Sequence, residues 1–187
     1  DTAMRIASTK NVPLVFTHHT MYERYTHYVP GDSPELQKFV MQLATGYANL
    51  CRAVIAPSES IREILRRRGV LVPIEVVPTG IDIDAFRRGD GAAARERYGI
   101  PAGAFVVGHV GRLAREKNLV FLAHVMSDFL RRYGKAHVLL VGDGAIAEEL
   151  DGIFEQAGVH GRVHRTGSLS GQQLYDGYAA MHVFAFA

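Results

Sequence analysis

The stretch FVVGHVGRLAREKN, residues 105–118, predicts a buried strand that runs through a loop into a helix. Its apolar part ends at Gly111, and Arg112 and Lys117 follow before a helical pattern begins. Backbone amides at a helix N-terminus lack intrahelical partners and attract anions, and a guanidinium and an ammonium beside them would bind phosphate oxygens. The stretch therefore indicates a phosphate site, although its spacing leaves an ordinary solvated loop equally open.

Short apolar runs of the same kind recur along the chain and alternate with helical patterns. Runs that are apolar on both faces and rich in Val are typical of buried parallel strands, so the alternation predicts an α/β fold with parallel sheets. The clearest predicted helices cover residues 34–50, 58–68 and 118–133. The predicted strands are LVFTH (14–18), AVIAPS (53–58), IEVVPTG (74–80), FVVGHVG (105–111), HVLLVGDG (137–144), RVHRTG (162–167) and HVFAFA (182–187).

A Gly-, Ala- and charge-rich segment near the middle divides the chain into two α/β halves. We interpret residues 83–104 as an interdomain linker with one or two short helices, because sustained apolar periodicity is weak there. The halves are then residues 1–82 and residues 105–187. Each has few strands, so we expect both domains to be incomplete in this chain.

Composition excludes several classes of protein. Hydrophobic residues make up 48% of the 187 residues and charged residues 21%, which is typical of a globular protein. The net charge of +2 gives no reason to expect a nucleic-acid partner. Apolar runs are too short for a membrane span, the N-terminus lacks a signal-peptide core, and the single Cys51 excludes an internal disulfide. We therefore expect a cytoplasmic protein.

The phosphate-binding signatures of other nucleotide-dependent enzymes are absent from the sequence. Neither the G-x-G-x-x-G of dinucleotide-binding proteins nor the P-loop motif occurs. A second glycine-rich turn, VGDGAIAEEL, follows the strand at 137–144, and its Gly142 could approach a ligand closely. For Asp143 between the two glycines, we favour an ordinary role in capping the turn.

Three segments, VVPTGIDIDAF (76–86), GHVGRLAREKN (108–118) and LLVGDGAIAEEL (139–150), together resemble retaining glycosyltransferases of family 4. That resemblance implies the GT-B fold, with two Rossmann-like domains, and a nucleotide-sugar donor held by the C-terminal domain. It implies that Arg112 and Lys117 bind the donor diphosphate and stabilise it as the leaving group, with Gly111 and Gly142 nearby. RVHRTGSLS (162–170) would line the base, with Arg165 and Thr166 beside it.

FTHHTMYERYTHY, residues 16–28, places three histidines and three tyrosines directly after a predicted strand. Such a cluster suggests the polar wall of a pocket. A metal site is disfavoured because the spacing matches no ligand motif. The remaining alternative is that the tyrosines form the core of an interface and the histidines are capped loop residues. The segment resembles family 4 enzymes that transfer glucose to diacylglycerol. By that resemblance His19, or else His18, faces the donor sugar, and an acceptor-side wall is formed by Tyr22, Glu23 and Tyr25.

The resemblance also implies what the chain lacks. The opening strand with its Gly-rich loop and the C-terminal Glu-x7-Glu region of the family are absent from residues 1–187, so we expect this chain to be poorly active or inactive. Residues 58–70 carry an apolar face and four arginines, which leaves open a peripheral contact with the inner face of the membrane; we favour a plain surface helix.

The function that the resemblance implies is that of a hexosyltransferase in glycolipid biosynthesis. By the same resemblance we expect a UDP-sugar donor, UDP-glucose above all, a lipid or sugar acceptor, and no metal or other cofactor. A GDP-mannose-dependent mannosyltransferase and a non-catalytic nucleotide-binding module are the alternatives.

Overall fold

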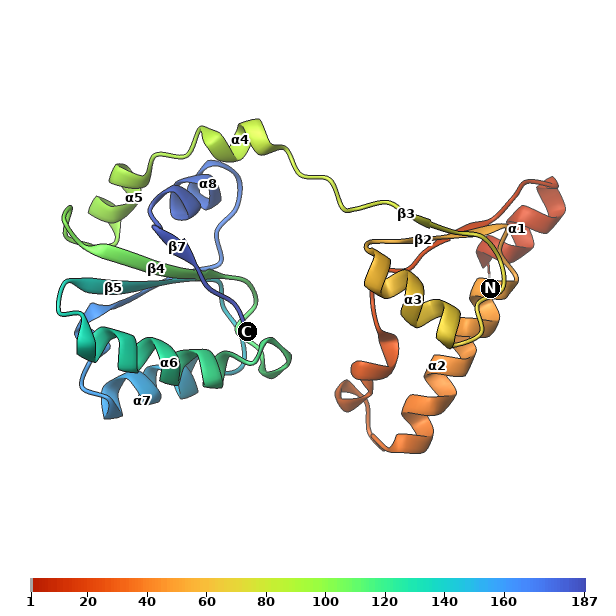
Figure 1. Cartoon of the computed structure of the whole chain (residues 1–187), viewed down its shortest axis with the longest axis horizontal. Helices are drawn as coiled ribbons and strands as arrows, with labels where there is room; N and C mark the ends of the chain where they lie inside the picture. The colour runs from red at the N-terminus through yellow and green to blue at the C-terminus, as the bar shows by residue number, and fades with distance from the viewer. Residues whose placement is uncertain (1) are drawn as a thin grey trace. The chain divides into compact units, whose positions relative to one another are not determined.

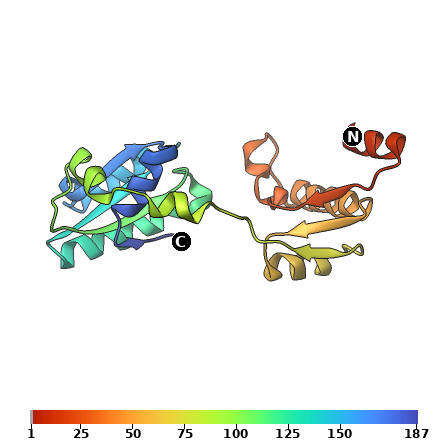
Figure 2. The ribbon, with the colours of Figure 1, turned by 90° about the horizontal axis from the view of Figure 1, so that it is seen from above.

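A computed structural model describes residues 2–187 and divides the chain into two compact units, residues 1–81 and 82–187. Unit 1 comprises α1 (Thr2–Lys10), β1 (Val15–Thr17), the 3₁₀ turns η1 (Tyr22–Arg24) and η2 (Thr26–Tyr28), α2 (Pro34–Asn49), β2 (Ala53–Ala56), α3 (Glu59–Arg67) and β3 (Ile74–Val76). Its parallel sheet has the order β1-β2-β3 (Figure 2). Phe16 lies opposite Val54, and Ile55 lies opposite Glu75.

The helices α2 and α3 begin where the sequence provides caps. The hydroxyl of Ser33 accepts a hydrogen bond from the amide of Leu36, and the hydroxyl of Ser58 accepts one from the amide of Ile61. A small core then packs α2 and α3 against the sheet; its buried residues are Ala48, Val54, Ala56, Leu65, Val70 and Ile74. Cys51 is also buried and forms no disulfide, in keeping with the role of a small hydrophobic residue.

Unit 2 is a larger parallel sheet covered on both faces. It comprises α4 (Ile83–Arg87), α5 (Gly91–Arg97), β4 (Phe105–Val110), η3 (Arg115–Lys117), α6 (Leu119–Arg132), β5 (Ala136–Val141), α7 (Ala147–Gln156), η4 (His160–Arg162), β6 (Val163–Gly167), α8 (Gly171–Ala179) and β7 (Val183–Phe184). The strand order is β6-β5-β4-β7, so the first and last strands of the unit are neighbours. Figure 1 shows α6 and α7 on one face and α4, α5 and α8 on the other.

Both faces of the unit 2 sheet are sealed by apolar cores. β5 is buried along its whole length, as expected for a strand at the centre of a doubly covered sheet. On the α6–α7 face the core is built around Leu130, Leu150 and Phe154, and on the other face around Val106, Leu139 and Val141. All seven predicted strands form, and every strand pair is parallel.

The segment 83–104 differs from our interpretation of it as an interdomain linker. It does contain two short helices, α4 and α5, but both pack against α8 and belong to unit 2. The glycines are the physical reason: a Cβ at Gly89 or Gly91 would overlap the backbone of α8, so the glycine-rich sequence permits a close helix contact. Arg95 of α5 secures this contact, since its guanidinium donates to the carbonyl oxygen of Ala180 at 2.7 and 3.0 Å.

Candidate functional site

The candidate site begins where β4 ends. Residues 111–118, which we call the cationic loop, leave the sheet at Gly111 and form the 3₁₀ turn η3 before α6 starts. Asn118, the N-cap of α6, has a φ of 51° and gives the helix no side-chain cap. The first turn of a 14-residue helix therefore faces the loop without a capping side chain, which leaves the positive end of its dipole to an external anion.

The loops after β4 and β5 interlock through their backbones. The amide of Leu113 donates to the carbonyl oxygen of Asp143 at 2.9 Å, and the amide of Ile146 donates to that of Leu113 at 3.2 Å. A Cβ at Gly142 would overlap the carbonyl oxygen of Gly111, so the two turns lie in direct contact. As predicted for the turn residue, the carboxylate of Asp143 accepts a hydrogen bond from the next amide, at 2.8 Å.

The end of β6 joins the same group of loops. The amide of Gly142 donates to the carbonyl oxygen of Gly167 at 2.9 Å, and the hydroxyl of Thr166 donates to the same oxygen at 2.7 Å. Thr166 thus lies beside the two predicted donor glycines. Arg165 is directed elsewhere, because its guanidinium pairs with Asp151 of α7 at 3.2 Å.

The three cations of the cationic loop differ in their ion-pair partners. Arg112 is 57% exposed and pairs with Glu116 at 2.8 Å, while Arg115 pairs across to Glu149 of α7 at 2.8 Å. Lys117 is exposed and has no ion-pair partner within residues 2–187. The structure thus brings Arg112, Lys117, Gly111, Gly142 and Thr166 to one edge of the unit 2 sheet, with an exposed positive charge among backbone turns.

In unit 1 the two adjacent histidines after β1 lie in different environments. His18 is 3% exposed, its ring contacts those of Phe16 and Tyr22 edge-on, and burial lowers its pKa from the ordinary histidine value. His19 is exposed. Of the two candidates, His19 is therefore the one that a substrate could reach within this unit.

The predicted acceptor-side residues divide in the same way. The rings of Tyr22 and Tyr25 are 45% and 36% exposed. Glu23 is held inside the unit, because its carboxylate pairs with Arg68 at 2.6 Å and both side chains are mostly buried. This ion pair fixes the turn η1 to the end of α3.

Within residues 58–70, the helix α3 (Glu59–Arg67) packs on its own sheet. Leu65 is 2% exposed, and Ile61 packs against the same core. The arginines are engaged as well: Arg62 pairs with Glu59, and Arg66 donates to the carbonyl oxygens of Val70 and Val72. The packing is that of the plain surface helix that we favoured, and no helix within residues 2–187 is long and apolar enough to cross a bilayer.

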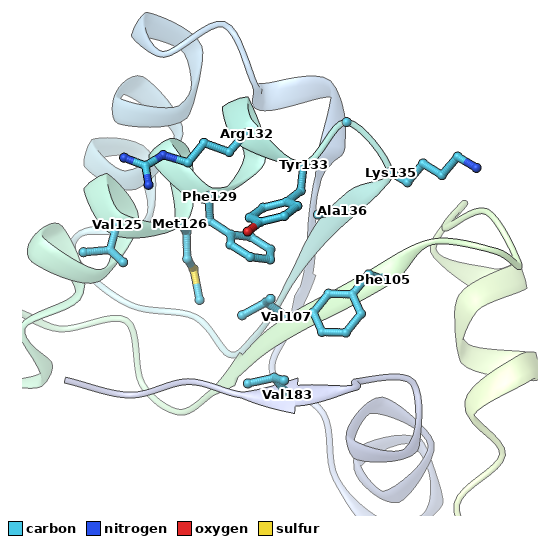
Figure 3. A pocket seen from close by; sticks show the side chains of 11 residues that line it. Phe105, Val107, Val125, Met126, Phe129, Arg132, Tyr133, Lys135, Ala136 and Val183 are labelled. Carbon is cyan, nitrogen blue, oxygen red and sulfur yellow. The ribbon is translucent and has the colours of Figure 1, made fainter.

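A cavity of about 860 Å³ is lined by none of the residues of the cationic loop (Figure 3). It opens at the amino ends of β4 and β7, where Phe105, Phe129 and Tyr133 surround an apolar space. Ligands of open parallel sheets bind at the carboxyl ends of the strands, where the loops carry polar groups. We therefore place the candidate site at the cationic loop rather than in this cavity. Residues 2–187 hold no cluster of three or more His, Cys, Asp or Glu side chains that could bind a metal.

His109 of β4 escaped the sequence analysis. It lies three residues before Arg112, is 4% exposed, and burial lowers its pKa. The signal that could have found it is a histidine inside an otherwise apolar strand, FVVGHV.

Comparison with known proteins places both units among glycosyltransferases. Residues 2–85 match the model of Glycosyltransferase Family 4, and residues 104–187 match that of Glycosyl transferases group 1. Alpha-monoglucosyldiacylglycerol synthase of Streptococcus pneumoniae is 28% identical over 97% of this chain and 42% of its own length. D-inositol 3-phosphate glycosyltransferase of Nocardia farcinica is 34% identical over 78% of this chain and 34% of its own length.

Solved structures show the same fold. HepE of Anabaena, crystallised with UDP and glucose, superposes with a TM-score of 0.78 at 22% identity, over 98% of this chain and 48% of HepE. Sucrose-phosphate synthase of Thermosynechococcus elongatus superposes with a TM-score of 0.74, also at 22% identity, over 96% of this chain and 45% of its own. These likenesses confirm the predicted GT-B fold class. The chain spans less than half the length of these relatives.

Proposed function

The chain belongs to the glycosyltransferases, with a family 4 domain followed by a group 1 domain, and from this premise we propose that it is part of a retaining hexosyltransferase that uses a nucleotide-sugar donor. The proposed donor is UDP-glucose and the proposed acceptor is a lipid or a sugar. The observation that carries the proposal is the cationic loop, where Arg112 and Lys117 lie beside the uncapped end of α6 and the interlocked glycine turn.

The loop provides what a departing nucleoside diphosphate requires. In the transfer, the acceptor hydroxyl oxygen bonds to C1 of the sugar while the bond from C1 to the diphosphate oxygen breaks, and the acceptor proton leaves with the diphosphate. Negative charge grows on the leaving group, and preorganised cations and amides stabilise it more than they stabilise the intact donor. Arg112 would exchange Glu116 for a phosphate oxygen, and Lys117 would add its ammonium charge.

Two kinds of relative support the donor and acceptor that we propose. HepE was crystallised with UDP and glucose, and the pneumococcal relative is named for a diacylglycerol that carries one glucose. In unit 1 the exposed His19, Tyr22 and Tyr25 are the side chains that we propose to face the donor sugar and the acceptor. A lipid acceptor would draw the enzyme to a membrane surface, where the exposed arginines of residues 58–70 would contribute charge rather than an apolar anchor.

Calorimetric titration of this chain with UDP and with GDP tests the donor site. We expect UDP to bind more tightly than GDP, and we expect R112A and K117A each to weaken UDP about 10- to 100-fold, the equivalent of one charge-assisted hydrogen bond. The matched control is R115A, which removes a cation of the same loop that is paired to α7. Preference for GDP would favour the mannosyltransferase, and equal losses in all three variants would contradict a specific diphosphate site.

A further inference from the structure

His109 is a buried titratable group that the proposed transfer does not use. Its ring is buried near the end of β4 and stacks on the ring of Phe184, with the two ring centroids 6.1 Å apart. Nδ1 lies 3.0 Å from the carbonyl oxygen of Ala185. A carbonyl oxygen only accepts hydrogen bonds, so Nδ1 carries a proton and the neutral ring presents a lone pair at Nε2.

Nε2 is buried and has no hydrogen-bond partner within the part of the chain described, residues 2–187. It is directed toward the cationic loop, because a Cβ built on Gly111 would lie 3.3 Å from it. A buried polar atom without a partner is costly, and each such atom in a native structure calls for an explanation, of which a catalytic or ligand-binding role is one. Here the atom lies directly behind the loop that we assign to the diphosphate.

The charged group that faces His109 belongs to the same loop. The positive charge of Lys117 on η3 adds to burial in lowering the pKa of His109, while the β7 side presents the Ala185 carbonyl oxygen and the Phe184 ring. A charge on the cationic loop thus changes the pKa of the imidazole. A bound diphosphate would carry the opposite sign and act in the opposite direction.

We propose that His109 is a positioning group of the donor site, which binds a proton at Nε2 when a diphosphate occupies the cationic loop. The resulting imidazolium supplies a third positive charge behind Arg112 and Lys117, held in place by the Ala185 carbonyl oxygen. The inference rests on the proposed function, since it requires the diphosphate to bind at this loop. Because the bound state takes up a proton, donor affinity rises as pH falls toward 6.

The experiment is calorimetric titration with UDP-glucose between pH 6 and 8, in pairs of buffers that differ in ionisation enthalpy. The difference between the buffers counts the protons taken up per donor bound. UDP-glucose is the probe because each of its phosphates carries one ester and one anhydride bond and so has no second ionisation. The terminal phosphate of UDP, in contrast, titrates near pH 6 itself, at about the second pKa of phosphate monoesters.

H109N is the test variant, because its amide still donates toward Ala185 while Nε2 is lost. We expect the wild-type chain to take up a fraction of a proton that is largest near pH 6. H109N should take up none. It should bind about threefold more weakly than wild type at pH 6, where one pKa unit of coupling is only partly expressed, and within about twofold of wild type at pH 8. H164N is the matched control, a histidine whose pKa burial also lowers but which lies in the amino-terminal half of β6; it should keep the uptake.

Each result decides between the proposals. Equal proton uptake by wild type and H109N overturns the role of His109 and leaves the proposed function standing. Failure of wild type to bind UDP-glucose at any pH overturns the donor site, and this inference with it. If H109N does not fold, the ring ¹⁵N signals of His109 in the wild-type chain serve instead: saturating UDP-glucose at pH 6.5 should shift them toward the protonated form, and unchanged signals overturn the proposal.

Discussion

Residue 142 has no room for any side chain. Gly142 has a φ of 136°, a conformation that L side chains rarely adopt, and a Cβ built on it would overlap the carbonyl oxygen of Gly111. The glycine therefore sets how closely the turn after β5 approaches the cationic loop. Any larger residue would have to push the two turns apart.

We expect G142A to destabilise unit 2 by about 2 kcal/mol or more, because the new methyl group meets backbone that cannot move cheaply. UDP binding should weaken as well, since the cationic loop shifts. Urea unfolding followed by circular dichroism, together with calorimetry, measures both effects. G152A is the control: Gly152 lies within α7 with open space around it, so alanine should stabilise the helix by about 0.5–1 kcal/mol. Equal stability of G142A and wild type would contradict the close contact.

Single residues mark the limit of the sequence reasoning. The sequence indicated Arg112 and Lys117 because cations at a strand-to-helix junction have a simple electrostatic meaning, and the structure places both on the loop. It could not distinguish His18 from His19, since only the packing of the first against Phe16 and Tyr22 separates them. Nor could it foresee that Glu23 finds Arg68, which lies 45 residues further on.

At the scale of elements, the strands were predictable because a parallel sheet covered on both faces requires continuous apolar runs. The structure of segment 83–104 was not predictable, because glycine occurs in two opposite structural settings. It is common in flexible connections, and it is also required where backbones pack closely, as α5 does on α8. Composition cannot separate the two, since the decisive neighbour, α8, lies some 80 residues further along the chain.

The docking of α5 can be tested through Arg95. We expect R95A to destabilise unit 2 by about 2 kcal/mol, because the guanidinium satisfies the carbonyl oxygens at the end of α8 and at Ala102. Urea unfolding provides the measurement. R97A on the same helix removes an exposed arginine and should change stability by less than about 0.5 kcal/mol. If R95A and R97A have the same free energy of unfolding, the contact of Arg95 with the end of α8 does not stabilise unit 2.

For the whole molecule, buried histidines link stability to pH. The pKa values of His18 in unit 1 and of His109, His137 and His164 in unit 2 are lowered, chiefly by burial. The last two lie 2.9 Å apart, Nδ1 to Nε2, so a second proton there is also opposed by the first. Below the ordinary histidine pKa the unfolded chain binds protons that the folded chain does not, and folding is weakened.

We therefore expect the free energy of unfolding to fall as pH drops from 7.5 to 5.5, and to fall more for unit 2, which holds three of the four histidines. Urea unfolding at the two pH values, with each unit followed by NMR signals of its own residues, checks this. H137N/H164N should reduce the pH dependence of unit 2 while leaving that of unit 1 intact. A free energy of unfolding that rises toward pH 5.5 would contradict this prediction.

The strand order of unit 2 has a consequence for the order in which the chain assembles. β4 lies between β5 and β7, and Val107 pairs with Val183. The amide of Asp90 likewise donates a hydrogen bond to the carboxylate of Asp176 on α8, which is synthesised much later. During synthesis, therefore, the first segments of this unit leave the ribosome long before their partners exist, and β4 keeps one bare edge until the last strand arrives. Long-range closure of this kind is slow and exposes apolar strands to other chains, so folding of unit 2 should depend more on chaperones than its size suggests.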